Sequence, residues 1–170
     1  GLEVGQDPDA VYDIVKMSKK KSTRPVLIKV STNVTDVVAI VSAAKDAGVD
    51  GVTAINTVKA MVIDIETGRP ILSHNVGGLS GPAIKSIAVQ SVYNISKNVD
   101  IPIIGCGGIS NWRDAIEFFL AGASAIQVGS AVAYKGIGVL GEIVDGIQKY
   151  FEKNNIKNIG ELVGKSHSYT

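Results

Sequence analysis

Two glycine-containing turns in this sequence could bind an anion. Gly107 and Gly108 follow an apolar run at 101–104, and Gly129 and Ser130 follow a second run at 124–128. Glycine lets a backbone approach a ligand closely, and backbone N–H groups at such turns are the donors that a phosphate group needs. Either turn alone is a weak signal, because glycine is common where helices start. Together, after consecutive strands, they predict a phosphate site at one edge of a sheet.

Polar residues lie at corresponding points elsewhere in the chain. Lys29 lies near the end of the apolar run at 25–30, where an ammonium is costly to bury unless it meets an anion or a wet site. A solvated lysine at a sheet edge is the alternative interpretation. Asn56 and Thr57 follow the run at 51–55 and offer amide and hydroxyl groups to a ligand, although turn formation explains them nearly as well. Gly81, before Pro82, would leave a free amide where a helix starts.

The elements that position these residues alternate along the chain. The apolar runs at 25–30, 51–55, 101–104 and 124–128 predict parallel strands buried on both faces. Capping residues at 7–9, 33–36 and 110–111, and Pro82, predict helix starts, with a further helix over 140–151 and a small terminal helix from Asn158. The helical spacing assigns a core-facing side to apolar residues that include Ile14, Ile87, Leu140 and Val144.

One pattern occurs twice, at 25–57 and at 102–130: proline, an apolar strand, a polar turn, an amphipathic helix, Ala-Gly, and a second strand. Such repeats predict right-handed βαβ units, with functional groups at the carboxyl ends of the strands. The longest connection, 56–79, contains segments 62–65 and 70–72 around a Gly-containing turn, which predict a β-hairpin. The sequence therefore predicts an α/β fold in one domain over 1–170.

Composition excludes several classes of function. The chain has 170 residues, a formal charge of +1 and 5% aromatic residues, which argues against nucleic-acid binding. It has no apolar run near the roughly 20 residues that span a bilayer, so no membrane partner is expected. The single cysteine, Cys106, indicates a reducing, cytoplasmic location and is interpreted as packing. His74 and His167 lie far apart in sequence, so no metal site is expected.

Five segments resemble a known family: PVLIKVSTNVTD (25–36), INTVKAMVIDIETGRP (55–70), NVGGLSGPAIKSIA (75–88), IPIIGCGGISNWRDAIEFFLAGASAIQVGS (101–130) and the tail IGELVG. In order and spacing they resemble the class 1 dihydroorotate dehydrogenases, most closely class 1B. The resemblance implies a (β/α)₈ TIM barrel that holds FMN and oxidises dihydroorotate to orotate in de novo pyrimidine biosynthesis. With about four βα units and the hairpin inserted after the second strand, this chain would be its C-terminal half.

The resemblance also implies site residues and partners. Asn56 and Thr57 would contact the pyrimidine substrate, and the FMN contacts would be Lys29, Ile55, Gly81, Gly107, Gly108, Gly129 and Ser130. The catalytic base of the 1B type is a cysteine on a loop of the first half, so no catalytic residue is expected in this chain. The implied partners are the missing N-terminal half or a second chain, a homodimer, and an electron-transfer subunit that carries FAD and an iron–sulfur cluster.

The sequence leaves alternatives open. Thr32 and Ala60 depart from the proline and glycine that are usual in the family, which blurs the assignment of substrate more than that of the flavin. One alternative is a dihydropyrimidine-dehydrogenase-like flavoprotein domain acting on another pyrimidine. Others are a non-catalytic half-barrel that binds flavin or phosphate, and a TIM-barrel lyase or isomerase without flavin that uses the same phosphate turns.

Overall fold

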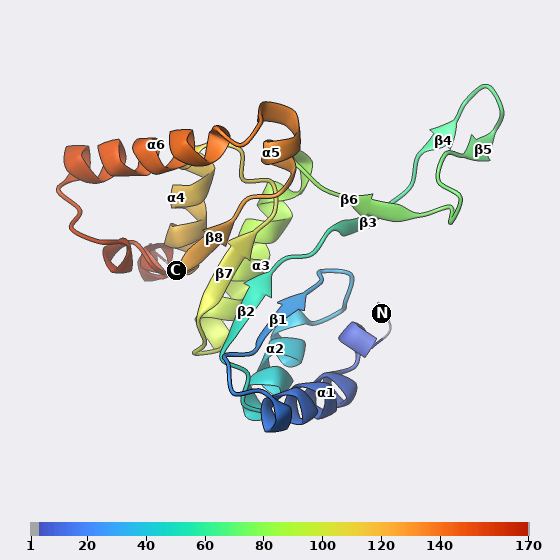
Figure 1. Cartoon of the computed structure of the whole chain (residues 1–170), viewed down its shortest axis with the longest axis horizontal. Helices are drawn as coiled ribbons and strands as arrows, with labels where there is room; N and C mark the ends of the chain where they lie inside the picture. Colours follow the sequence, from blue (N-terminus) through green and yellow to red (C-terminus); the bar gives the residue numbers. More distant parts are fainter. Residues whose placement is uncertain (1–3, 170) are drawn as a thin grey trace.

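The computed structural model describes residues 4–169 and is built around a parallel sheet (Figure 1). Its strands are β1 (Leu27–Val30), β2 (Gly51–Ala54), β7 (Ile103–Cys106) and β8 (Ala125–Gln127), in the order β1-β2-β7-β8. All three pairings are parallel. The ladder starts later than predicted in β1 and β7, because Pro25 and Pro102 have no N–H to donate to it.

Helices cover one face of this sheet. They are α1 (Pro8–Lys21), α2 (Val37–Asp46), α3 (Lys85–Asn98) and α4 (Trp112–Ala121), and α2, α3 and α4 pack against the strands. The side chains of Asp7, Asp36 and Asn111 cap α1, α2 and α4 by accepting backbone N–H groups. A Cβ on Gly105 of β7 would contact Phe118 of α4, so this strand position faces the helices.

The other face of the sheet has no helices packed on it. Because residues paired across a ladder point to the same face, Lys29, Thr53, Ile104 and Ala125 share the side opposite Gly105. Lys29 and Ala125 are exposed, and Ile104 is half-buried. The apolar core therefore lies between the sheet and the helices, where the largest fully buried side chains include Phe118, Ile95 and Ile103.

Four side chains assigned to the core lie outside it. The exposed fractions are 50% for Ile14, 39% for Ile87, 39% for Leu140 and 62% for Val144. The prediction was wrong for these residues because each helix contacts its neighbours over a narrow stripe. Within α3, Ala88, Val92 and Ile95 form that stripe and are fully buried.

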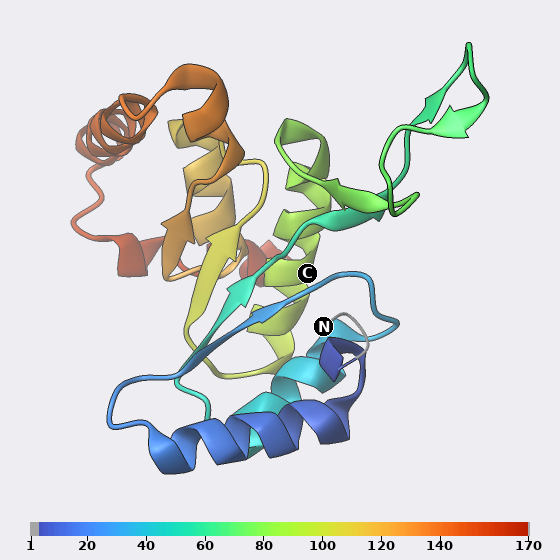
Figure 2. The same cartoon turned by 45° about the vertical axis from the view of Figure 1, so that its right-hand side comes forward.

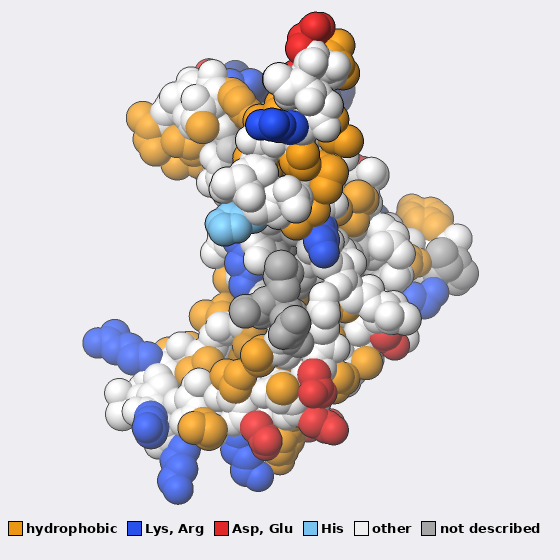
Figure 3. All heavy atoms as spheres, turned by 90° about the vertical axis from the view of Figure 1, so that its right-hand side faces the viewer, with side chains coloured by type: hydrophobic (Ala, Val, Ile, Leu, Met, Phe, Trp, Pro, Cys, Tyr) orange, Lys and Arg blue, Asp and Glu red, His pale blue; other side chains and the backbone are white. Residues whose placement is uncertain are grey.

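The connection between β2 and α3 forms a projecting arm, residues 58–79 (Figures 1 and 2). Near its base β3 (Val58–Ala60) pairs with β6 (Gly77–Leu79), and farther out β4 (Ile63–Asp64) pairs with β5 (Arg69–Pro70), both antiparallel. The sequence did not predict the β3–β6 ladder. Hydrophobic side chains gather on the arm in Figure 3, and Val62, Ile65 and Ile71 are more than half exposed.

The chain after β8 differs from its prediction in two places. Ser130 begins a helix, α5 (Ser130–Lys135), which the sequence did not predict, and the long helix α6 (Val139–Asn154) follows it. The predicted terminal helix is instead two 3₁₀ turns, η3 (Ile159–Glu161) and η4 (Lys165–Tyr169). Two other 3₁₀ turns lie earlier in the chain, η1 (Val4–Gln6) and η2 (Pro82–Ile84). Across residues 4–169, no helix combines the length and the apolar character needed to cross a membrane.

Candidate functional site

A pocket of about 150 Å³ lies at the carboxyl end of the sheet. It contains all nine residues that the sequence singled out for binding: Lys29, Ile55, Asn56, Thr57, Gly81, Gly107, Gly108, Gly129 and Ser130. Ser80, Ile84, Cys106, Ile109 and Gln127 complete its lining. Pockets that enclose a whole small ligand usually measure roughly 300–1,000 Å³, so these walls suit one part of a larger ligand.

The turn after β7 requires glycine at two consecutive positions. Gly107 has φ +137° and Gly108 has φ +74°, conformations that side chains rarely adopt. A Cβ on Gly108 would lie 2.8 Å from the carbonyl oxygen of Gly81 and 2.9 Å from the backbone nitrogen of Lys85. A Cβ on Gly107 would lie 2.8 Å from the Cβ of Ala88. The turn is therefore pressed against the start of α3.

The second turn, after β8, is open. Gly129 has φ −110°, and no atom lies within 4 Å of the position that its Cβ would take. Ser130 approaches Gly81, since its Oγ lies 3.7 Å from where a Cβ on Gly81 would be. The structure thus brings together three chain segments that the sequence separates widely.

Backbone donors remain available in this pocket. Within residues 4–169, the N–H groups of Gly107, Gly108 and Gly129 donate no hydrogen bond. Unpaired N–H groups converging on one concave surface form an anion-binding site, and a phosphate group accepts several such bonds at once. The donor set and the missing Cβ atoms fit the phosphate group of a nucleotide or flavin.

Lys29 is the only charged residue among those that line the pocket. It lies on the helix-free face of β1, and it takes part in none of the ion pairs formed within residues 4–169. Lys29 is exposed. A cation at the tip of an apolar strand, with no carboxylate partner in the described chain, suits interaction with an anionic ligand.

Asn56 and Thr57 lie at the end of β2, where their loop is held by hydrogen bonds. The backbone N–H of Asn56 donates to the Val30 oxygen at 2.8 Å, and the Asn56 Oδ1 accepts from the Thr57 N–H at 2.9 Å. Asn33 then fixes the next residues, because its Nδ2 donates to the Thr57 oxygen at 3.3 Å and its Oδ1 accepts from the Lys59 N–H at 3.0 Å. The sequence did not predict this role of Asn33.

Cys106 and Gln127 also line the pocket, and Gln127 was not predicted to do so. They pair in register across β7 and β8, so both point to the helix-free face. Cys106 is half-buried. The alternation of side chains along each strand was the signal that could have placed both residues beside the glycine turns.

An ion-pair cluster lies behind the glycine turn. Lys85 Nζ lies 3.0 Å from Asp114 Oδ1 and 2.6 Å from Glu117 Oε2. Burial opposes ionisation of Asp114, but hydrogen bonds from Ser110 and Lys85 outweigh it and hold the pKa of Asp114 below its ordinary value of 3.8. The hydrogen bonds of Lys85 to Glu117 and Asp114 raise its pKa above 10.5. Asp114 and Lys85 are therefore both ionised at neutral pH.

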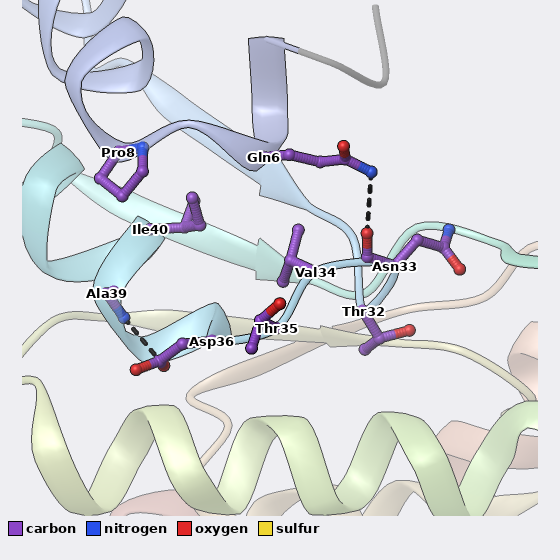
Figure 4. A pocket seen from close by; sticks show the side chains of 9 residues that line it. All are labelled: Gln6, Pro8, Thr32, Asn33, Val34, Thr35, Asp36, Ala39 and Ile40. Carbon is purple, nitrogen blue, oxygen red and sulfur yellow. Dashed lines mark hydrogen bonds between the residues drawn. The ribbon is translucent and has the colours of Figure 1, made fainter.

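A larger pocket, of about 610 Å³, opens beside the loop that follows β1 (Figure 4). Gln6 reaches across it to donate to the Asn33 backbone oxygen at 2.9 Å. Its only charged side chain, Asp36, is engaged as the cap of α2, accepting from the N–H groups of Val38 and Ala39. This pocket offers a ligand no free charge, and so the smaller pocket is the better candidate site.

Comparison with known proteins identifies the family. The family model described as dihydroorotate dehydrogenase matches residues 1–151. The catalytic subunit of dihydroorotate dehydrogenase B (NAD(+)) from Pyrococcus furiosus is 51% identical over 164 residues, which cover 96% of this chain and 55% of that protein. The subunit of the same name from Methanocella arvoryzae is 48% identical over 167 residues, 98% of this chain and 55% of that protein.

Solved structures agree. The crystal structure of DHODH from Eimeria tenella, in complex with ferulenol, matches with a TM-score of 0.79 and 26% identity, over 95% of this chain and 49% of that one. The chain spans about half the length of the curated relatives it matches. The chain therefore belongs to the dihydroorotate dehydrogenase family, among relatives named as class 1B catalytic subunits.

Proposed function

We propose that this chain is the FMN-holding, C-terminal half of a (β/α)₈ barrel that oxidises dihydroorotate to orotate in pyrimidine biosynthesis. The observation that carries the proposal is the pair of glycine turns, which line one pocket and whose glycine N–H groups donate no hydrogen bond within residues 4–169. Such a pocket suits the single phosphate of FMN. Family membership supplies the reaction class, and the pocket supplies a place for the cofactor.

The roles of the pocket residues follow from their chemistry. Gly107, Gly108, Gly129 and Ser130 would hold the phosphate group, with Gly81 and Ile55 beside them. When bound, FMN would accept the two electrons that leave the substrate. Lys29 would stabilise negative charge on the ligand, because it is a cation at the strand end. Asn56 and Thr57 would hydrogen-bond the polar edge of the pyrimidine.

The uncovered face of the sheet supports a barrel completed by sequence outside these 170 residues. Leu27 on that face is 49% exposed, and β1 and β8 each have one neighbouring strand in the sheet that residues 4–169 form. Unpaired strand edges and an apolar face are usually covered in a stable protein. We propose that the missing half pairs with these edges and carries the catalytic base.

The names of the relatives support a larger assembly. They are called catalytic subunits, and a catalytic subunit works beside another subunit. We propose an electron-transfer subunit that carries FAD and an iron–sulfur cluster, and a homodimer of the catalytic chain. The exposed apolar arm supplies one surface on which such contacts would form.

The test is to purify the full-length protein, extract its flavin and identify it by chromatography. FMN is expected, and turnover of dihydroorotate should then be measured with NAD, fumarate and a quinone as acceptors. The isolated 170-residue chain should show no turnover, since the base would be absent.

Recovery of FAD from this polypeptide would contradict the cofactor assignment. A preference for another dihydropyrimidine would favour the dihydropyrimidine-dehydrogenase-like alternative, and turnover by the isolated chain would contradict the location of the base.

A further inference from the structure

A buried carboxylate lies directly behind the first glycine turn. Asp114, on the first turn of α4, is 7% exposed. Its Oδ2 accepts from the Ser110 N–H at 2.9 Å, the Ser110 Oγ at 3.0 Å and the Asn111 Nδ2 at 2.8 Å. Its Oδ1 accepts from Lys85 Nζ at 3.0 Å. One carboxylate thus joins the segment after Gly108 to the first residue of α3.

These bonds fix the two sides of the contact that Gly108 makes. Ser110 is two residues after Gly108, so its hydrogen bonds to Asp114 hold the end of the glycine turn. Lys85 is the residue whose backbone nitrogen would lie 2.9 Å from a Cβ on Gly108, and its side chain is tied to the same carboxylate. Asp114 therefore connects the end of the glycine turn to the helix start against which Gly108 packs.

Capping of α4 does not require this carboxylate. Asn111 already caps α4, since its Oδ1 accepts from the N–H groups of Arg113 at 2.8 Å and Asp114 at 3.3 Å. Burying an ionised side chain is costly, and an apolar residue would satisfy packing alone. The position instead retains a charge with several donors around it, which is the chemistry of a residue that holds a loop in one arrangement.

We propose that Asp114 is a positioning residue, which sets the Gly107–Gly108 turn against Gly81 in the spacing that receives the phosphate group of the flavin. This inference rests on the proposed function, because it assigns the pocket to FMN. Asp114 would not touch the ligand. It would act through Ser110 and Lys85, so its effect should be confined to the phosphate end of the ligand.

The experiment compares two ligands that differ by that phosphate group. Apoprotein of the full-length wild type and of Asp114→Asn is titrated with FMN and with riboflavin. Since Asn111 Nδ2 and the Ser110 N–H would face an amide in place of a carboxylate, the variant should bind FMN roughly tenfold more weakly. Riboflavin affinity should change less than about twofold.

Asp50→Asn is the matched control. Asp50 also accepts from a lysine, Lys19 Nζ at 2.7 Å, and from a backbone N–H, that of Val26 at 2.6 Å, but it precedes β2 at the opposite end of the sheet. The Asp50→Asn variant should leave the ratio of FMN to riboflavin affinity at the wild-type value. Thermal midpoints are recorded for both variants, so that loss of stability is separated from loss of phosphate recognition.

The outcomes separate this inference from the proposed function. An Asp114→Asn protein with a lower thermal midpoint and an unchanged affinity ratio would show that the residue is merely structural. If that variant does not fold, Ser110→Ala, which removes one donor, should lower the ratio by roughly threefold, and an unchanged ratio there would overturn the inference. Wild-type protein without preference for FMN over riboflavin would instead overturn the proposed function itself.

Discussion

The two ends of the parallel sheet are built from similar parts that are used differently. At the amino end, Gly48 has φ +91° with no atom within 4 Å of its Cβ position, and Asp50 pairs with Lys19. At the carboxyl end, Gly108 has φ +74° against crowded neighbours, and Asp114 pairs with Lys85. Within residues 4–169, the carboxyl end combines such parts with a pocket and with N–H groups that donate no hydrogen bond. Crowding and unused donors, rather than residue types, distinguish the end that we propose as a binding site from the other end.

The largest effect is expected from Gly108→Ala. The new Cβ would contact the Gly81 oxygen and the Lys85 nitrogen, and neither backbone atom can move without shifting the start of α3. Strain and contact together should cost on the order of 2–4 kcal/mol, which would lower FMN affinity by roughly 30- to 1,000-fold. Flavin content of the purified full-length protein and titration of its apoprotein measure this loss.

Gly48→Ala is the control for that substitution. It also forces a side chain into a positive φ, but into open space, so it should destabilise by about 1–2 kcal/mol while flavin affinity stays at the wild-type value. Equal flavin loss in both variants would mean that strain anywhere in the sheet disrupts the pocket, and the contrast between the two ends would not hold.

A smaller effect is expected from Lys29→Ala. Loss of one charge-assisted interaction, about 1.5–3 kcal/mol, should slow reduction of the flavin by substrate roughly ten- to a hundredfold or somewhat more, and lower its reduction potential. The glycine turns would still hold the phosphate. Stopped-flow reduction of the full-length protein tests this, with Lys19→Ala at the amino end as the control. An unchanged rate and potential in Lys29→Ala would identify Lys29 as a solvated strand-end residue.

The smallest effect is expected on the pH dependence of the free energy of unfolding. The pKa values of Asp50 and Asp114 both lie below 3.8 in the folded protein. A lowered pKa contributes stability that is fully present above 3.8 and is lost as the pH falls from there through the folded-state value. Urea unfolding of the full-length apoprotein between pH 6 and pH 3 should therefore depend less on pH in Asp114→Asn than in the wild type. A slope equal to that of the wild type would remove Asp114 from the acid-sensitive groups.

The positions of strands, caps and pocket-lining residues could be predicted from local rules. Asp7 and Asp36 cap their helices as expected, and the strand-end rule brought Lys29 and Ser130 to one pocket. Exposure could not be predicted as well, because periodicity finds an apolar stripe without showing how much of it a neighbour covers. Ile87 and Val144 lie on the uncovered margins of their helices. The β3–β6 ladder was not predicted, because its second strand, Gly77–Leu79, contains two glycines, and glycine is disfavoured in strands.

The ion pair of Asp114 with Lys85 was not predicted for another reason. The sequence position of Asp114, three residues after a helix cap, is one where acidic residues are common because they favour the helix dipole. Its partner Lys85 lies 29 residues earlier in the chain. Only the packing of α3 beside α4 brings the two together, so no local pattern could have predicted the cluster.

The arm also has a consequence for how the sheet assembles. Paired residues are 24 apart between β1 and β2 (Leu27 and Gly51) and 21 apart between β7 and β8 (Ile104 and Ala125). Between β2 and β7 they are 51 apart (Val52 and Ile103), because the arm and α3 intervene. Closing a chain loop about twice as long costs only about 0.6 kcal/mol more in entropy. The sheet thus accommodates the arm at little thermodynamic cost, while the central β2–β7 pairing is expected to form after the two outer pairs.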